Sequence, residues 1–382
     1  MTTYNKNERY YLLDIFRGIA AICVVLQHYQ HFFYAKPGVI SSNFIYTAQP
    51  FFEIIYPFYK FGSVAVQFFF ILSGFIFFAI YRKKIFNREI DFKKFFILRI
   101  SRLYPLHFLT LIFVLIFQKL FYILYSEYFV YPNNSLNNFI FHFFLIQEWG
   151  LSNFLSLESS AGFNHPSWSI SVEIFAYISF FVISLSYAKN FFQTFLILIL
   201  IFLSYIFLNS FFSSLLLGFF LFYLGGLTFF LSDKIIRILD RKRMIVIGSI
   251  FILNILVFGR FLNDIFMNLQ QSLNFLIDNR FMIQLFLIKF PLLIINLNII
   301  QYYFKNLGKN FQIIGELSYT IYLIHFLIQI ILMIINYEFI NFDFYSKYFF
   351  ILYFFIIFIT SFIVYKFYEL PLKYKIRKIY KS

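Results

Sequence analysis

Apolar segments long enough to cross a lipid bilayer follow one another along this chain and leave little room for any other kind of fold. Of its 382 residues, 61% are hydrophobic and 13% are charged, whereas soluble domains have about 45–50% apolar and about 25% charged residues. A helix needs roughly 20 apolar residues to span the hydrocarbon core, so we predict an all-α membrane protein with about ten transmembrane helices. We expect these helices at residues 12–34, 61–81, 103–125, 167–188, 191–208, 211–231, 244–259, 281–303, 312–335 and 348–366.

The positive side chains alternate between the connections, and this alternation predicts the orientation of the chain. Lys and Arg gather before the first span, in the even-numbered connections and after the tenth span, whereas residues 126–166 contain neither. Cytoplasmic loops collect Lys and Arg, which places both termini in the cytoplasm. The net charge of +15 is thereby explained by topology and by anionic membrane lipids, and no nucleic-acid partner is expected.

The domain organisation follows from the short connections. None is long enough to fold alone, so we expect no soluble domain and a single membrane domain over 1–382, with a transmembrane core at about 10–371 and a basic cytoplasmic tail at 372–382. The first apolar segment is charged and lacks a cleavage site, which indicates a multi-pass protein of the cell (inner) membrane without a cleaved signal peptide. The single cysteine, Cys23, argues against a disulfide framework and a Cys-rich metal site, and no metal is expected.

Ionisable residues inside a span are costly and often mark a functional site. The first predicted span contains Asp14, Arg17 and His28. Eleven residues are about three helical turns, so Arg17 and His28 share a face and lie about 16 Å apart along the axis. The alternative interpretation is an Asp14–Arg17 pair at a helix end with His28 at the membrane interface.

Two further groups of polar residues stand near predicted span ends. Arg99 and Arg102 are three residues apart and suited to bidentate contacts with phosphate, although basic residues before a span are common. Glu173 is the costly member of the stretch from Trp168 to Glu173, in which Ser169 is also suited to capping the helix. His325, in the ninth span, fits a buried structural imidazole as well as a functional one.

These stretches resemble the motifs of acyltransferase family 3, a family of membrane O-acyltransferases, over about residues 10–371. Ile15 and Ala65 stand where the family usually has glycine, a difference that affects packing more than chemistry. The matching stretches, in chain order, are Leu13-Asp14-Ile15-Phe16-Arg17-Gly18 with His28; Gly62 to Phe75; Arg99, Arg102, Tyr104 and Pro105; Trp168 to Glu173; Gly315 to His325; and Glu369 with Pro371.

The resemblance implies an enzyme that moves an acyl group, usually acetyl, from cytoplasmic acyl-CoA to a hydroxyl of a surface polysaccharide, such as a bacterial lipopolysaccharide, or of its lipid-linked precursor. Acetyl-CoA is then the expected co-substrate, and a glycan or lipid-linked glycan is the expected acceptor.

The resemblance also suggests roles for the polar residues. His28 is the expected general base, with Glu173 orienting it. Three sets of residues are expected: catalytic residues His28, Glu173, Arg17 and Asp14; CoA-binding residues Arg99, Arg102 and Arg17; and acceptor-binding residues Trp168, Ser171, Tyr319 and His325.

A transporter or flippase for a glycan or lipid-linked sugar is the alternative interpretation. It has the same many spans and intramembrane charges, but it moves its substrate without consuming a thioester. No inverted repeat of the kind found in many transporters is visible.

Overall fold

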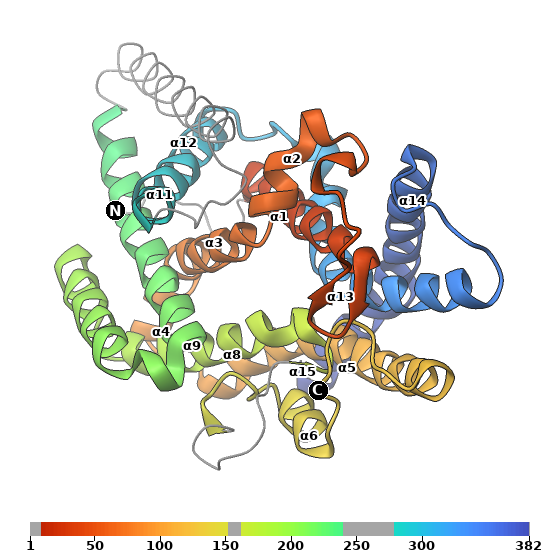
Figure 1. Ribbon diagram of the computed structural model, residues 1–382. Helices are drawn as coiled ribbons and strands as arrows, with labels where there is room; N and C mark the ends of the chain where they lie inside the picture. The colour runs from red at the N-terminus through yellow and green to blue at the C-terminus, as the bar shows by residue number, and fades with distance from the viewer. Residues whose placement is uncertain (1–8, 152–161, 240–278, 382) are drawn as a thin grey trace.

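The computed structural model describes residues 9–151, 162–239 and 279–381. In this part of the chain the fold is a bundle of helices, and the strands form one small hairpin (Figure 1). The elements are α1 (Tyr11–His28), η1 (Tyr29–Phe33), β1 (Tyr34–Lys36), β2 (Val39–Ile40), η2 (Tyr46–Ala48), α2 (Phe52–Phe61), α3 (Val64–Ile80), α4 (Arg82–Phe86), α5 (Phe92–Tyr125), α6 (Leu136–Phe144), η3 (His165–Ser167), α8 (Trp168–Ser184), α9 (Phe191–Leu239), α11 (Asn279–Gln284), η4 (Leu285–Lys289), α12 (Phe290–Tyr303), η5 (Lys309–Phe311), α13 (Gln312–Glu338), α14 (Lys347–Val364), η6 (Tyr365–Glu369) and α15 (Leu370–Lys381).

The predicted all-α membrane fold is confirmed. Within the described residues, eight helices are long and apolar enough to cross a membrane, or nine if α2 and α3, which meet at a bend of 64°, form one broken span. Nine of the ten predicted segments coincide with these helices. The remaining one, 244–259, lies outside the described residues.

The helix that contains the third predicted span begins before residue 103, where we expected the span to start. α5 begins at Phe92, and the side chain of Asp91 caps it by accepting a hydrogen bond from the backbone N–H of Lys94 at 2.6 Å. A carboxylate that satisfies a free N–H at a helix start is a common N-cap. Arg99 and Arg102 therefore lie inside a helix, about two turns from its start.

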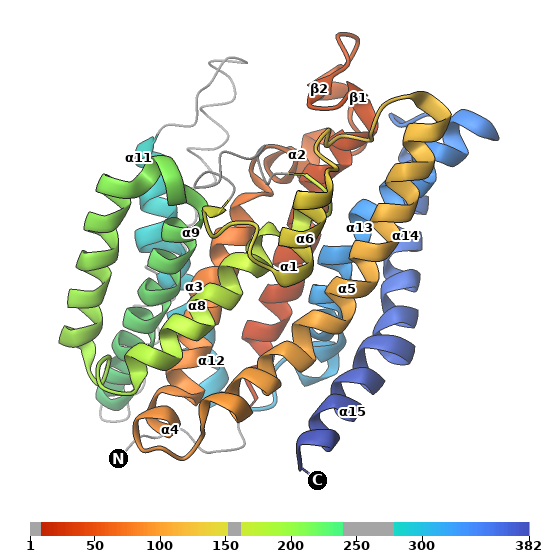
Figure 2. The ribbon, with the colours of Figure 1, turned by 90° about the horizontal axis from the view of Figure 1, so that it is seen from below.

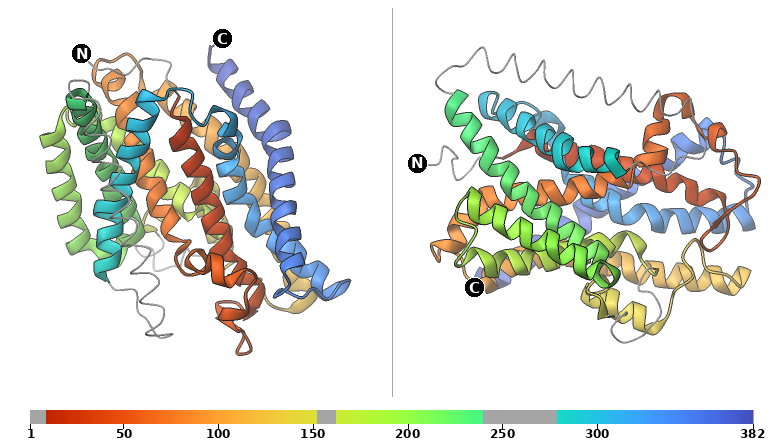
Figure 3. Two further views of the ribbon diagram at one scale, coloured as in Figure 1. Left: turned by 90° about the horizontal axis from the view of Figure 1, so that it is seen from above. Right: turned by 60° about the vertical axis from the view of Figure 1, so that its left-hand side comes forward.

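The start of α1 and the end of α15 lie at the same end of the bundle, whereas the β1–β2 hairpin lies at the opposite end (Figures 2 and 3). We call the former the basic end, because the basic helix α4 also lies there. Arg82 of α4 donates a hydrogen bond to the backbone carbonyl of Lys189. The cytoplasmic location of this end stays a prediction.

Glycines allow α3 and α9 to pack with their backbones in contact. A Cβ atom added to Gly74 would lie 1.8 Å from the carbonyl oxygen of Phe222, and one added to Gly225 would lie 2.0 Å from that of Ile71. Membrane helices lack a hydrophobic driving force between them and rely on such close packing.

Close backbone packing at glycines also joins α1 to α13. A Cβ atom on Gly18 would lie 2.4 Å from the carbonyl oxygen of Ile314, and one on Gly315 would lie 2.4 Å from that of Asp14. Two motif glycines from opposite ends of the sequence thus face each other's helix, which brings the polar residues of α1 against α13.

We expect Gly225→Ala to destabilise the protein by about 1–3 kcal/mol, because the new methyl group overlaps the backbone of α3. The measurement is the midpoint of thermal aggregation in detergent. Leu231→Ala is the control, since this residue lies on the same helix with its side chain 41% exposed. Equal midpoints for the two variants would contradict the close packing of α3 and α9.

Candidate functional site

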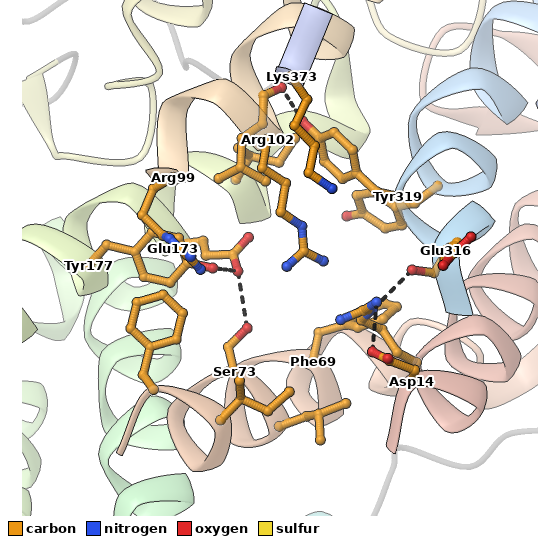
Figure 4. Close-up of a pocket in the computed structure, with 18 of the residues that line it drawn as sticks. Asp14, Phe69, Ser73, Arg99, Arg102, Glu173, Tyr177, Glu316, Tyr319 and Lys373 are labelled. Carbon is orange, nitrogen blue, oxygen red and sulfur yellow. Dashed lines mark hydrogen bonds and ion pairs between the residues drawn. The ribbon is translucent and has the colours of Figure 1, made fainter. Parts of the chain in front are cut away.

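A cavity of about 590 Å³ lies near the basic end, between α1, α3, α5, α8, α13 and the η6–α15 segment. Figure 4 shows 18 of the lining residues, which come from elements far apart in the sequence. Six cationic side chains face four carboxylates around it: Arg9, Arg17, Arg99, Arg102, Lys373 and Arg377, with Asp14, Glu173, Glu316 and Glu369. Of the predicted site residues, Asp14, Arg17, Arg99, Arg102, Glu173 and Tyr319 line the cavity, whereas His28, Trp168, Ser171 and His325 do not.

Arg17 ties α1 to α13. Its Nη2 donates to the Gly315 carbonyl at 3.0 Å and lies 3.0 Å from Asp14 Oδ1, and its Nε donates to Ser318 Oγ at 3.1 Å. The alternative interpretation, an Asp14–Arg17 pair, is thus realised, but inside the cavity rather than apart from it. Most of the hydrogen-bonding capacity of Arg17 is used by the protein itself.

Arg9 adds a second link between these helices. It lies 3.1 Å from Asp14 and 2.8 Å from Glu316 of α13, whose other oxygen accepts a hydrogen bond from Tyr365 at 3.1 Å. In the sequence, Arg9 contributes only to the topology signal, because it precedes the first span.

Arg99 is held by aromatic rings. Its guanidinium lies over the rings of Phe77 and Tyr81, 5.1 and 4.7 Å from their centroids, and donates a hydrogen bond to the Tyr81 hydroxyl. Such cation–π contacts orient an arginine without neutralising it. Arg99 therefore adds positive charge to the cavity wall from a fixed position.

Arg102 and Lys373 point into the cavity (Figure 4). In the described part of the chain, neither has a hydrogen bond or an ion pair with a protein group. Lys373 belongs to α15, which packs against α5, where Arg377 donates to Ser101 Oγ at 3.0 Å. Lys373 lies in the predicted tail at 372–382, so it is absent from the predicted site. The signal in the sequence is its position four residues, or one helical turn, after Glu369.

The acidic side chains of α8 and η6 are anchored by hydroxyl groups. Glu173 accepts hydrogen bonds from Ser73 Oγ at 3.0 Å and from the Tyr177 hydroxyl. Glu369, 4% exposed, accepts one from Thr320 Oγ1 at 2.7 Å. Glu369 ends a π-helical turn, a local widening of the helix that is frequent at functional sites.

His28 lies beyond the cavity, in a cluster of histidines. Its Nδ1 is 2.7 Å from His325 Nε2, and its ring stacks on His31 with centroids 4.6 Å apart. Gln329 joins the two by donating to the His28 carbonyl at 2.7 Å and accepting from His31 Nδ1 at 3.0 Å. Since Glu173 bonds to Ser73 and Tyr177, the structure does not bring it to His28, and His325 takes that place.

Tyr131, in the connection after α5, completes the cluster. Its hydroxyl lies 3.4 Å from His31 Nε2, and its ring stacks on His165 at 4.2 Å. Burial raises the pKa of the Tyr131 phenol, which therefore keeps its proton at neutral pH and can donate it to His31.

Tyr322 and Ser169 separate the cavity from this cluster. Both line the cavity, their hydroxyl oxygens are 2.9 Å apart, and the Tyr322 ring lies 6.2 Å from that of His325. The hydroxyl of Ser169 also donates to the Pro166 carbonyl at 3.4 Å, so the suggestion that it caps the helix is wrong. One pair of hydroxyl-bearing residues thus connects the cavity wall to His325, the hydrogen-bond partner of His28.

Trp168 and Ser171 hold neighbouring structure in place. Ser171 Oγ accepts from the Glu148 backbone N–H at 3.2 Å, and its carbonyl accepts from Trp149 Nε1 at 3.1 Å. The Trp168 ring lies 6.1 Å from that of Phe70. Tyr319 does line the cavity, and its hydroxyl donates to the Leu103 carbonyl at 2.6 Å.

A second cavity, of about 200 Å³, lies at the opposite end of the bundle. Its wall approaches the histidine cluster through Tyr34, whose ring lies 5.6 Å from that of His31. The residues that give it aromatic faces, hydroxyl groups and charges are Tyr34, Tyr125, Tyr128, Tyr337, Lys36 and Glu127.

No group of three or more His, Cys, Asp or Glu side chains in the described ranges is arranged to hold a metal ion. The histidine cluster is instead built from ring-to-ring and ring-to-amide contacts.

The long apolar helices and the charged cavity between them define a multi-pass membrane protein with a polar site inside its bundle. The chain belongs to acyltransferase family 3, since the family model, described as an acyltransferase domain, matches residues 10–366. A curated protein of Rhizobium radiobacter, "Protein 2 in picA locus", is 35% identical over 104 residues, which are 27% of this chain and 43% of that protein. The match thus spans less than half of that relative. No solved structure matches this chain.

We expect Glu173→Gln to lower the rate of acyl transfer at least about tenfold, because the cavity loses a carboxylate while the size of the side chain is kept. Ser73→Ala, which removes one neutral donor to the same carboxylate, is expected to have a much smaller effect. The measurement is turnover of the purified protein in lipid. Normal activity of Glu173→Gln would remove Glu173 from the catalytic residues.

Proposed function

We propose that this protein is a membrane O-acyltransferase that moves an acyl group, most simply acetyl, from acyl-CoA to a hydroxyl of a cell-surface glycan or its lipid-linked precursor. It does so from the cell (inner) membrane, with both termini in the cytoplasm. The observation that carries the proposal is the pair Arg102 and Lys373, which point into one cavity of a family member and have no hydrogen bond or ion pair within the described residues.

The acyl donor suits this cavity. CoA carries a diphosphate and a further phosphate, and Arg and Lys are the usual phosphate-binding side chains. Arg102 and Lys373 are free to bind them, whereas Arg17 and Arg99 contribute charge from positions fixed by protein contacts. The expected clamp of Arg99 with Arg102 is thus replaced in this proposal by Arg102 with Lys373.

The thioester reaches His28 along α1. The axial distance from Arg17 to His28 is about 16 Å, a span that the thin pantetheine arm of CoA can bridge. Its path passes Tyr322 and Ser169, at the boundary between the cavity and the histidines. With the phosphates held at the basic end, the reacting carbonyl lies near the imidazole.

His28 is then the general base. It removes the proton of the acceptor hydroxyl while the oxygen attacks the thioester carbonyl, and the collapse of the intermediate breaks the C–S bond. The proton passes from His28 to the departing thiolate, so the reaction yields the ester and free CoA. General base catalysis contributes typically about 10²–10⁴-fold.

The acceptor enters from the opposite end. The smaller cavity there combines aromatic rings, which cover the apolar faces of a sugar ring, with hydroxyl and charged groups that bind sugar hydroxyls. Its approach to His31 through Tyr34 leads toward His28. A glycan bound on that side and CoA bound at the basic end meet at the histidines.

Arg102→Gln and Lys373→Gln are each expected to weaken acetyl-CoA binding about 10–100-fold, the value of one charge-assisted hydrogen bond. The measurement is calorimetric titration of the protein in lipid nanodiscs. Lys366→Gln is the matched control, because Lys366 is exposed, lies about two helical turns before Lys373 and is outside the cavity.

Titration with 3′-dephospho-acetyl-CoA then assigns the phosphates. Substitution of the residue that binds the 3′-phosphate should no longer weaken binding of this analogue, whereas substitution of the other residue still should. Wild-type affinity in both variants would overturn the donor site, and substrate flux in liposomes without any CoA release would favour a transporter.

We expect Tyr128→Ala to raise the concentration of acceptor at half-maximal rate without changing acetyl-CoA binding, because it removes one aromatic wall of the smaller cavity. The assay is the release of free CoA from acetyl-CoA in the presence of a crude extract of the host's surface glycans. Ile123→Ala is the control, since this side chain is 76% exposed near the same end of α5. An unchanged acceptor dependence would remove this cavity from the acceptor path.

A further inference from the structure

Four of the six histidines of the chain lie in one cluster, namely His28, His31, His165 and His325. In the proposed reaction, only His28 acts on the proton of the acceptor. The hydrogen bond between His28 Nδ1 and His325 Nε2, at 2.7 Å, joins the general base to a second imidazole. In a bond between two ring nitrogens, one nitrogen carries the hydrogen and the other provides the lone pair.

The backbone of α13 decides which nitrogen is the donor. His325 Nδ1 lies 3.3 Å from the carbonyl oxygen of Ile321, which can only accept. His325 therefore carries its hydrogen on Nδ1, and its Nε2 is the acceptor. It follows that His28 donates through Nδ1–H, and that His28 Nε2 holds the lone pair.

We propose that His325 is a positioning residue that keeps His28 in the Nδ1–H tautomer, with Nε2 as the basic nitrogen. This inference rests on the proposed function, in which His28 accepts the proton of the acceptor hydroxyl. In hydrolytic triads an aspartate orients the histidine. Here a neutral pair, the His325 ring and the Ile321 carbonyl, has that role. His325 is thereby not an acceptor-binding residue.

Burial agrees with this division of roles. His325 is fully buried, with 0% of its surface exposed, whereas His28 is partly exposed. The two are held in register by Gln329, one turn after His325, which donates to the His28 carbonyl at 2.7 Å. The less buried residue of the pair thus carries the lone pair, and the fully buried one orients it.

The proton balance of the reaction is complete within this pair. The acceptor hydroxyl gives its proton to His28 Nε2, and the positive charge that forms on His28 is stabilised by the bond from its Nδ1–H to His325. When the C–S bond breaks, the same proton moves from Nε2 to the thiolate. His325 keeps its own Nδ1 hydrogen throughout, and no further proton donor is required.

Nitrogen-15 NMR of the histidine side chains tests the tautomer directly. The protein is labelled at the imidazole nitrogens in lipid nanodiscs, and the six signals are assigned with single His→Gln variants. We expect the wild type to show His28 protonated at Nδ1 only. We expect His325→Leu to shift His28 toward the Nε2–H tautomer, and His325→Gln, whose amide oxygen can accept from Nδ1–H, to keep the wild-type tautomer.

Turnover distinguishes positioning from a structural role. His325→Leu is expected to lower the maximal rate about 10²-fold or more without changing acetyl-CoA binding, and His325→Gln is expected to restore a large part of that rate. A wild-type His28 protonated at Nε2, or equal rates and tautomers in wild type and His325→Leu, would overturn the proposal.

The same measurements distinguish failure of the positioning role from failure of the proposed acyl transfer. If the wild type shows the expected tautomer but releases no CoA with any acceptor extract, the orientation of His28 by His325 stands and the acyl transfer fails. Loss of acetyl-CoA binding in His325→Leu but not in His325→Gln would assign His325 to the donor site instead and overturn its positioning role.

Discussion

The contact between α1 and α13 is the interaction on which the rest of the site depends. Gly18 and Gly315 let the two backbones meet without intervening side chains. Near the basic end, this contact places Arg17 against the carbonyl of Gly315. Further along, it places His28 within hydrogen-bonding distance of His325. A single helix pair therefore positions both the charged cavity and the histidine cluster.

The cavity shows how a membrane protein holds many charges in an apolar surrounding. Charged side chains are costly at this depth unless they are paired or face a cavity. Arg9 and Arg17 share the carboxylate of Asp14, and Arg99 lies on aromatic rings. Arg102 differs, because within the described residues no protein group satisfies it, and this excess positive charge is what makes the site suited to an anion.

Local patterns predicted much of this arrangement. The lengths of the apolar runs predicted the spans, and the helical repeat placed Arg17 and His28 on one face, which is the face that α13 contacts. The start of α5 was missed because its basic first turns look like a loop, although Asp91 provides an N-cap. Lys373 was missed because a basic segment after the last span has the composition of a tail.

The sequence by itself determined that this chain is a multi-pass membrane protein, which residues are polar inside its spans and which family it resembles. These properties depend on neighbouring residues, through the length of an apolar run and the repeat of a helix. The tertiary structure alone decided the partners: His325 for His28, Ser73 for Glu173, and the cavity for Lys373. The physical reason is that these pairs come from helices distant in the sequence, and only the close packing of backbones at glycine contacts sets which side chains meet.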